Sequence, residues 1–159
     1  MTSFPTQRGI VMDTISTFNP RQRLENLLIL LHKEILEGRG DGEIADTYRD
    51  AMDGDWYLLD STDRSLINHL SGDLYMISDR EIKRPISIGE DTEELEKQYR
   101  LAFSDGRWID TLHILRKIHI SPPHELSFIR ACCWGKLGFQ YAAVCFLEFS
   151  ISQLLQTIP

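Results

Sequence analysis

The chain lacks the features that mark secreted, membrane-spanning and signal-bearing proteins. Its three cysteines are an odd number and two of them are adjacent, which does not fit a disulfide framework. The longest apolar run, residues 27–31, is far too short to span a bilayer. The N-terminal residues contain no long apolar segment of the kind found in signal peptides. We therefore expect a cytoplasmic protein without a membrane partner.

Basic residues are scarce as well. The formal net charge is −7, and residues 1–90 hold 10 Lys and Arg against 16 Asp and Glu, whereas residues 91–159 hold 7 against 8. Binding to nucleic acid needs clustered Lys and Arg to neutralise phosphates, and anionic membrane surfaces attract the same residues. An acidic chain without a basic block is therefore expected to have no nucleic-acid partner.

Motifs for metal binding and catalysis are absent from the sequence. There is no HExxH, no CxxC and no repeated Glu-x-x-His. The glycine-rich stretch 38–42 lacks the Gly-Lys-Ser/Thr of a phosphate-binding loop. Cys132 and Cys133 fall within a helical pattern, where free cysteines usually pack as small hydrophobes. We expect no catalytic residue, no metal and no cofactor, although an enzyme or metal site built from scattered His, Asp and Glu stays open as an alternative.

The sequence does contain strong helical periodicity. Asn19 and Pro20 suit the cap and first turn of a helix that ends at Gly38, and its apolar residues recur at helical spacing. The same reasoning predicts further helices over residues 43–52, 62–77, 91–104, 107–119, 123–137 and 139–155. No segment alternates like a strand, so the expected fold is all-α with about seven helices.

Several local details follow from the same pattern. Ser61 or Thr62 is predicted to cap the third helix, and Gly72 to weaken it. The fourth predicted helix, residues 91–104, has an expected buried stripe of Leu95, Tyr99, Ala102 and Phe103. We divide the chain into a flexible N-terminal tail (residues 1–18), an N-terminal helical region (19–84) and a pair of helical hairpins (91–157).

A repeat of turn and stripe residues occurs in the last part of the chain. Gly138 follows Gly106 by 32 residues, and Ala143 and Leu147 repeat the offsets of Thr111 and Leu115. Small residues at corners, apolar stripes and a proline stop (Pro122-Pro123) are typical of stacked helical hairpins. A weaker echo pairs residues 48–56 with 99–108, which indicates either a decayed hairpin or chance. Trp56, Trp108 and Trp134 lie next to turns, and we expect them to join neighbouring hairpins or, alternatively, one of them to anchor a bound peptide.

Residues 92–155 resemble tetratricopeptide-like helical repeats. The second repeat carries the resemblance with Ala131, Trp134, Gly138 and Ala143, and the first with Leu95, Gly106, Trp108 and the proline stop, with Thr111 where Ala is usual. The resemblance implies antiparallel hairpins in a right-handed superhelix that binds peptides along its first helices, here 92–104 and 123–137. Exposed candidate binding residues on those helices are Glu93, Glu96, Arg100 and Phe128. The Lys, Asn and Arg set with which the family clamps a C-terminal carboxylate is not present.

These observations favour a non-catalytic adaptor that binds another protein or a peptide segment. A self-associating structural protein is the alternative, because two hairpins leave an end face uncovered that a homodimer would bury.

Overall fold

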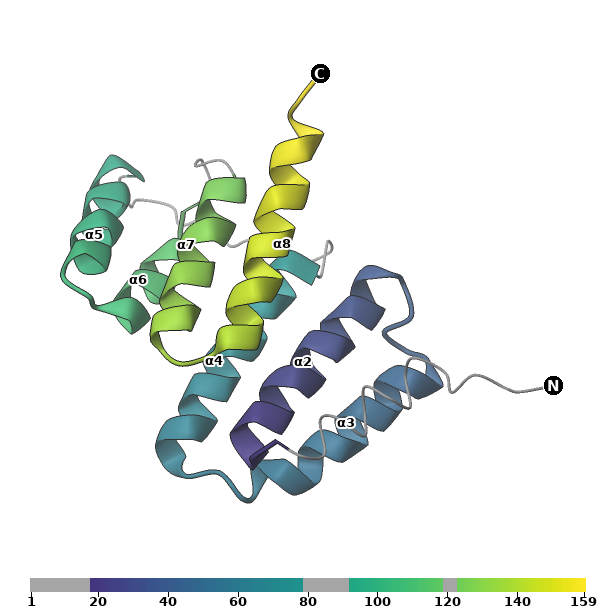
Figure 1. Ribbon diagram of the computed structural model, residues 1–159. Coiled ribbons are helices and arrows are strands. Elements are labelled where there is room, and N and C mark those ends of the chain that lie inside the picture. The colour runs from purple at the N-terminus through teal and green to yellow at the C-terminus, as the bar shows by residue number, and fades with distance from the viewer. Residues whose placement is uncertain (1–17, 79–91, 119–122) are drawn as a thin grey trace. The chain divides into compact units, whose positions relative to one another are not determined.

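The computed structural model describes residues 18–78, 92–118 and 123–159. Outside the described residues lie residues 1–17 of the expected tail, residues 79–91 with the predicted helix start at Asp91, and residues 119–122 with Pro122 of the proline stop. Within these ranges the fold is all-α, with seven helices and no strand (Figure 1). The chain divides into two compact units, residues 1–80 and 81–159, and each is described by itself.

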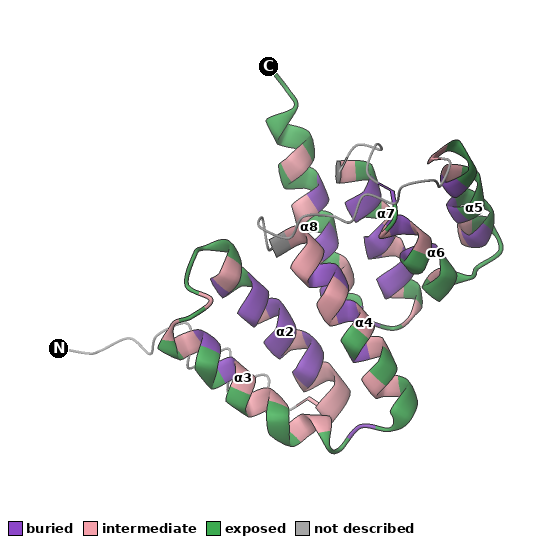
Figure 2. Cartoon of the chain, turned by 180° about the vertical axis from the view of Figure 1, so that it is seen from behind, coloured by how far each residue is buried: buried purple, intermediate pink, exposed green. Residues whose placement is uncertain are grey.

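The first unit is built around one central helix. α2 (Pro20–Leu36) packs against both α3 (Glu43–Trp56) and α4 (Ser61–Ser78). Leu27 and Leu31 of α2 meet Ala45 and Tyr48 of α3 in a buried cluster. Figure 2 shows the buried positions following one another along α2, as expected for a helix that is covered on more than one side.

The start of α2 confirms the predicted cap. The Oδ1 atom of Asn19 accepts a hydrogen bond from the backbone N–H of Gln22 at 2.8 Å, and the Oε1 atom of Gln22 accepts one from the Asn19 N–H at 3.3 Å. Together they form a capping box with Pro20 in the first turn. Two otherwise unsatisfied N–H groups are thereby bonded at the point where the chain enters the first unit.

α3 continues four residues beyond its predicted end at residue 52. Asp55 in the added turn pairs with Arg23 of α2, with Nη2 and Oδ1 2.8 Å apart and Nε also within hydrogen-bond distance of the carboxylate. Both side chains are largely shielded from water, so the pair fixes the last turn of α3 against α2. Gly54 lies inside this helix rather than at a corner, so the echo between residues 48–56 and 99–108 does not mark a repeated turn.

The cap predicted for α4 was wrong by one residue. Asp60, not Ser61 or Thr62, accepts the hydrogen bond from the backbone N–H of Asp63, at 2.8 Å. Ser61 is already the first residue of the helix. The helix then runs through Gly72 without a break, because packing on α2 outweighs a propensity cost of about 1 kcal/mol.

The second unit is a row of four helices. α5 (Thr92–Ser104), α6 (Trp108–Leu115), α7 (Pro123–Lys136) and α8 (Gln140–Gln156) each pack on the next, and α5 and α7 run in the same direction (Figure 1). A shared core takes its buried residues from the first three of them: Leu95, Tyr99, Leu115, Ile118 and Leu126. α6 ends at Leu115, four residues before its predicted end. Backbone bonds from Lys117 to Ile114 and from Ile118 to Leu115 tighten the chain there and turn Ile118 into the core.

The 32-residue spacing corresponds to one backbone geometry used twice. Gly106 and Gly138 have φ of 73° and 90°, which an L side chain rarely adopts. At the first corner the N–H of Arg107 donates to Ala102 O and that of Gly106 to Phe103 O. At the second corner Phe139 donates to Trp134 O and Gly138 to Gly135 O, at distances within 0.1 Å of the first. Both are Schellman motifs.

Aromatic pairs close the same two corners. Trp108 meets Phe103 edge to face at 5.5 Å between ring centroids, and Trp134 meets Phe139 in the same manner at 5.2 Å. Each ring therefore contacts an aromatic residue across its own corner, within one hairpin. Thr111, where the resemblance leads one to expect Ala, is fully buried and donates its hydroxyl to Arg107 O at 2.8 Å, so the extra polar atom is satisfied.

Candidate functional site

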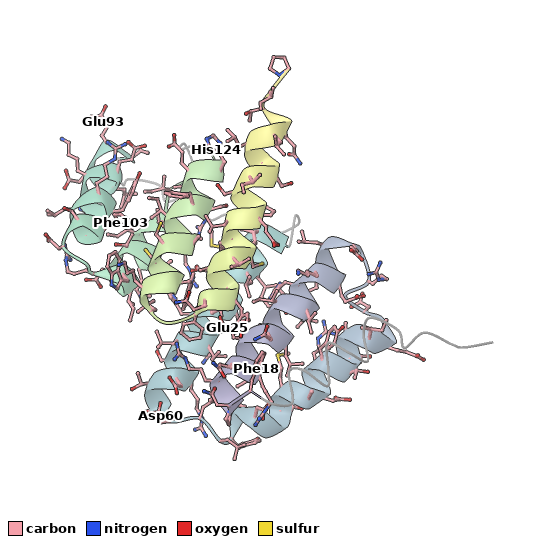
Figure 3. All side chains as sticks on the ribbon, in the orientation of Figure 1. Phe18, Glu25, Asp60, Glu93, Phe103 and His124 are labelled. Atoms are coloured by element: carbon pink, nitrogen blue, oxygen red, sulfur yellow. The ribbon has the colours of Figure 1, made fainter. Side chains whose placement is uncertain are left out.

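A pocket of about 400 Å³, here called the α5–α7–α8 pocket, lies on the second unit. Tyr99 contributes from α5, Ser150 and Leu154 come from α8, and α7 supplies the rest of the lining: His124, Glu125, Phe128 and Ile129. The volume lies in the range of ordinary ligand pockets. Figure 3 shows His124 at the start of α7, so the pocket lies at the end of the unit where α7 begins.

The walls of the pocket are fixed by packing and by hydrogen bonds. Tyr99 is only 7% exposed and belongs to the shared core, which sets its position in α5. Across the hairpin the hydroxyl of Ser150 donates to His124 O at 2.6 Å, and that of Ser127 donates to Gln153 Oε1 at 3.0 Å. These bonds join α7 to α8 next to the pocket, so its two longest walls are held together before anything binds.

Charged groups surround the opening unevenly. The guanidinium of Arg100 lies 5.9 Å from the ring centroid of Tyr99 and 3.9 Å from the carboxylate of Glu96. Hydrogen bonding to Tyr99 raises the pKa of Arg100, with smaller contributions from Glu96 and Glu125. Glu125 is exposed and is the one acidic residue in the lining. The rim thus combines one engaged cation with two carboxylates.

The candidate residues expected from the sequence divide into three groups. Phe128 lines the pocket and is 49% exposed. Arg100 and Glu96 lie beside it through their contacts with Tyr99 and with each other. Glu93 is exposed on the first turn of α5 and does not line the pocket (Figure 3).

Most of the lining was not anticipated. Tyr99 was expected only as a core residue, but it is both buried in the core and presented to the pocket. Glu125, Phe128 and Ile129 share one side of α7 by their i, i+3, i+4 spacing, which the sequence offered as a signal. Ser150 and Leu154 reach the pocket because α8 runs antiparallel to α7, and this depends on tertiary packing.

The described residues offer little support for a metal site or a reactive nucleophile. Among them no group of three or more His, Cys, Asp and Glu side chains is arranged to hold a metal ion. None of the three cysteines forms a disulfide, and burial raises the pKa of the Cys132 thiol, which lowers its reactivity at neutral pH. Within the same ranges, none of the helices has the length and apolar character needed to cross a membrane.

No family model, curated protein or solved structure matches the chain. The geometry of the α5–α7–α8 pocket and the chemistry of its lining are therefore the basis for proposing a function.

Proposed function

We propose that the chain is a non-catalytic protein-interaction module whose α5–α7–α8 pocket receives an apolar side chain of a partner peptide with Lys or Arg beside it. The observation that carries the proposal is the position of Phe128. It is a half-exposed aromatic residue on the wall of a pocket whose lining includes the carboxylate of Glu125.

Phe128 has the properties of a binding anchor. Large aromatic residues in pockets contribute much of the free energy of protein association, and a rigid ring loses little conformational entropy when it is covered. A volume of about 400 Å³ suits one aromatic or branched aliphatic side chain of the peptide. The hydrogen bonds of Ser127 and Ser150 hold the walls in place, which reduces the cost of ordering on binding.

The charge around the pocket favours a basic neighbour for that side chain. Glu125 lines the pocket, and Glu96 lies next to it through Arg100. The only basic group in this set already interacts with Tyr99 and Glu96, so an added Lys or Arg of the peptide is attracted by the remaining negative charge.

The resemblance to tetratricopeptide-like repeats agrees with this proposal. In such repeats the first helix of each hairpin lines the peptide site, and here α5 and α7 supply five of the seven lining residues. The identical Schellman corners at Gly106 and Gly138 support two equivalent hairpins. Three cysteines outside any disulfide suit a reducing compartment such as the cytoplasm, and the acidic composition disfavours nucleic acid and anionic membrane as partners.

A displayed random-peptide library selected on the full chain tests the proposal. We expect enriched peptides to share one large apolar residue next to Lys or Arg, and Phe128→Ala to weaken their binding at least about tenfold, as for an anchor residue. Leu101→Ala is the matched control, because Leu101 is 59% exposed on α5 and lies outside the pocket. Equal loss in both variants, or no enrichment at all, contradicts the proposal.

Two charge-reversal variants are expected to change the affinity for the selected basic peptides in opposite directions. Glu125→Lys removes the acidic lining residue and should weaken binding of the selected basic peptides. Arg100→Glu removes the rim cation and should strengthen it, more so at low ionic strength. Titrating a labelled peptide at two salt concentrations measures both, and effects of the same sign would show that the peptide's charge is not read at this rim.

A further inference from the structure

The outward side of α8 carries a regular apolar stripe. The helix packs on α7 through its buried residues Ala142, Phe146 and Ser150. Away from these buried positions lie Val144, Leu147, Ile151 and Leu154, followed after the helix end by Ile158, with exposed fractions between 37% and 62%. Leu154 also lines the α5–α7–α8 pocket. These five residues are defined here as the α8 seam.

The spacing of the α8 seam is that of a coiled coil. Successive members are separated by three, four, three and four residues. This alternation places the four members within α8 in a single line along the helix, with Ile158 just beyond its end, which is the pattern with which two helices interlock side chains. A helix that only needs to cover its own hairpin gains nothing from a second apolar line on the far side.

We propose that the α8 seam is the interface of a homodimer, in which it packs against the same seam of a second copy of the chain. A two-fold interface requires a self-complementary surface, and a heptad line of branched apolar residues is self-complementary. The seam meets the peptide pocket at one residue, Leu154, and its other four members lie outside the pocket lining.

Charge favours a second copy over a different partner. α8 contains Glu148 as its single charged residue, in a chain whose formal net charge is −7. Two acidic copies repel each other over most surfaces, but along α8 each presents one carboxylate, so this is where they approach at the lowest electrostatic cost. A basic or acidic partner helix, in contrast, would find almost no opposite charge on α8.

The area of the seam agrees with a weak dimer. The exposed parts of the five side chains, taken over two copies, amount to on the order of 1,000 Å², which is the lower limit for a specific interface. An interface of this size, apolar and without charge pairs, predicts dissociation in the micromolar range rather than an obligate dimer.

Sedimentation velocity of the full chain over a series of concentrations tests the proposal. We expect the mass to rise from monomer to dimer, and Ile151→Glu to weaken the dimer at least about tenfold, because it places a carboxylate within an apolar seam. Leu101→Glu is the control, an equally exposed position on α5 that should leave the dimer intact. Circular dichroism verifies that both variants keep their helix content, and Ile151→Gln replaces Ile151→Glu if the charged variant unfolds.

Hydrogen exchange of α8 at low and high concentration completes the test without a variant. Slower exchange in α8 at high concentration supports the dimer. A wild-type chain that stays monomeric at high concentration, or a dimer unaffected by the substitution at Ile151, would overturn the proposal. Phe128→Ala should leave the dimer unchanged and Ile151→Glu should leave peptide binding unchanged, so the two proposals can fail separately.

Discussion

The two units treat their apolar residues differently. In the described part of the first unit, the large hydrophobic side chains that remain exposed are Leu36, Tyr57 and Leu58, all at a helix end or in the turn between α3 and α4. In the second unit they lie along helix faces, above all on α8, and Figure 2 shows much of the C-terminal half of that helix as exposed. The first unit thus keeps its apolar surface inside, whereas the second holds more than its own four helices bury.

The buried residues show the reverse contrast. α2 of the first unit buries Glu25, His32 and Glu34 among its leucines. The α7–α8 hairpin buries the guanidinium of Arg130, which stays charged at any ordinary pH, and otherwise mainly apolar and small residues, with Trp134, Phe139 and Phe146 fully covered. Buried ionisable groups make the stability of a fold sensitive to pH. Exposed apolar patches mark surfaces that bind other molecules. We infer that binding belongs to the second unit and pH sensitivity to the first.

The largest expected effect comes from two tryptophan substitutions. Trp134→Ala removes a fully buried ring, and we expect it to lower the free energy of unfolding by about 3–5 kcal/mol. Trp56→Ala removes a partly exposed ring beneath the Arg64 guanidinium, whose carbon lies 5.8 Å from the ring, and should cost about 1 kcal/mol. Urea unfolding followed by circular dichroism measures both, and losses of similar size would remove the distinction between a core and a surface tryptophan.

The next effect concerns pH and the first unit. His32 is 2% exposed, lies edge to face with Tyr75 at 4.4 Å, and has its pKa lowered from 6.5 to about 4 by burial, with a smaller contribution from Arg49. Below pH 6.5 the unfolded chain takes up a proton that the folded ring does not. Stability is therefore complete above pH 6.5 and falls between pH 6.5 and 4, by on the order of 3 kcal/mol.

Hydrogen exchange of α2 peptides across that pH range, corrected for intrinsic rates, measures the loss. His32→Phe keeps an aromatic ring against Tyr75 but cannot take up a proton, so it should flatten the dependence. If the slope is the same in this variant, the acid sensitivity of the first unit arises from groups other than His32.

Local signals predicted the parts of the fold that depend on neighbouring residues. Asn19 caps α2 as expected, and Gly106 and Gly138 form corners because left-handed backbone at a helix end demands glycine. The third such glycine, Gly38, ends α2 in the same way, with bonds from Gly38 to Ile35 O and from Arg39 to Glu34 O. These features are set by a few consecutive residues and can be read from the sequence.

Features that depend on distant residues were missed. The end of α3 is held by Arg23, 32 residues away from Asp55, and no local pattern announces that pair. For the same reason, the sequence predicted only part of the candidate site. Phe128 lies on the same side of α7 as Glu125 and Ile129, which is a local property, whereas Ser150 and Leu154 reach the pocket only once α8 has folded back on α7. Tyr99 was predicted only as a core residue, because the helical spacing of apolar residues assigns each position to either the buried or the exposed side of its helix.

The smallest expected effect comes from substituting Gly54 and Gly106, the two glycines that occupy matching positions in residues 48–56 and 99–108. The two substitutions are expected to change stability in opposite directions. Gly106→Ala forces a Cβ into a backbone at φ 73°, and we expect it to destabilise the second unit by about 1–2 kcal/mol. Gly54→Ala lies inside α3 with nothing within 4 Å of the new Cβ, so it should stabilise the first unit by about 0.5–1 kcal/mol. Thermal unfolding of both variants measures the difference. Opposite signs would establish that Gly-x-Trp is a corner in the second unit and helix interior in the first, while destabilisation by both would restore a turn at Gly54 and with it a repeated hairpin in the first unit.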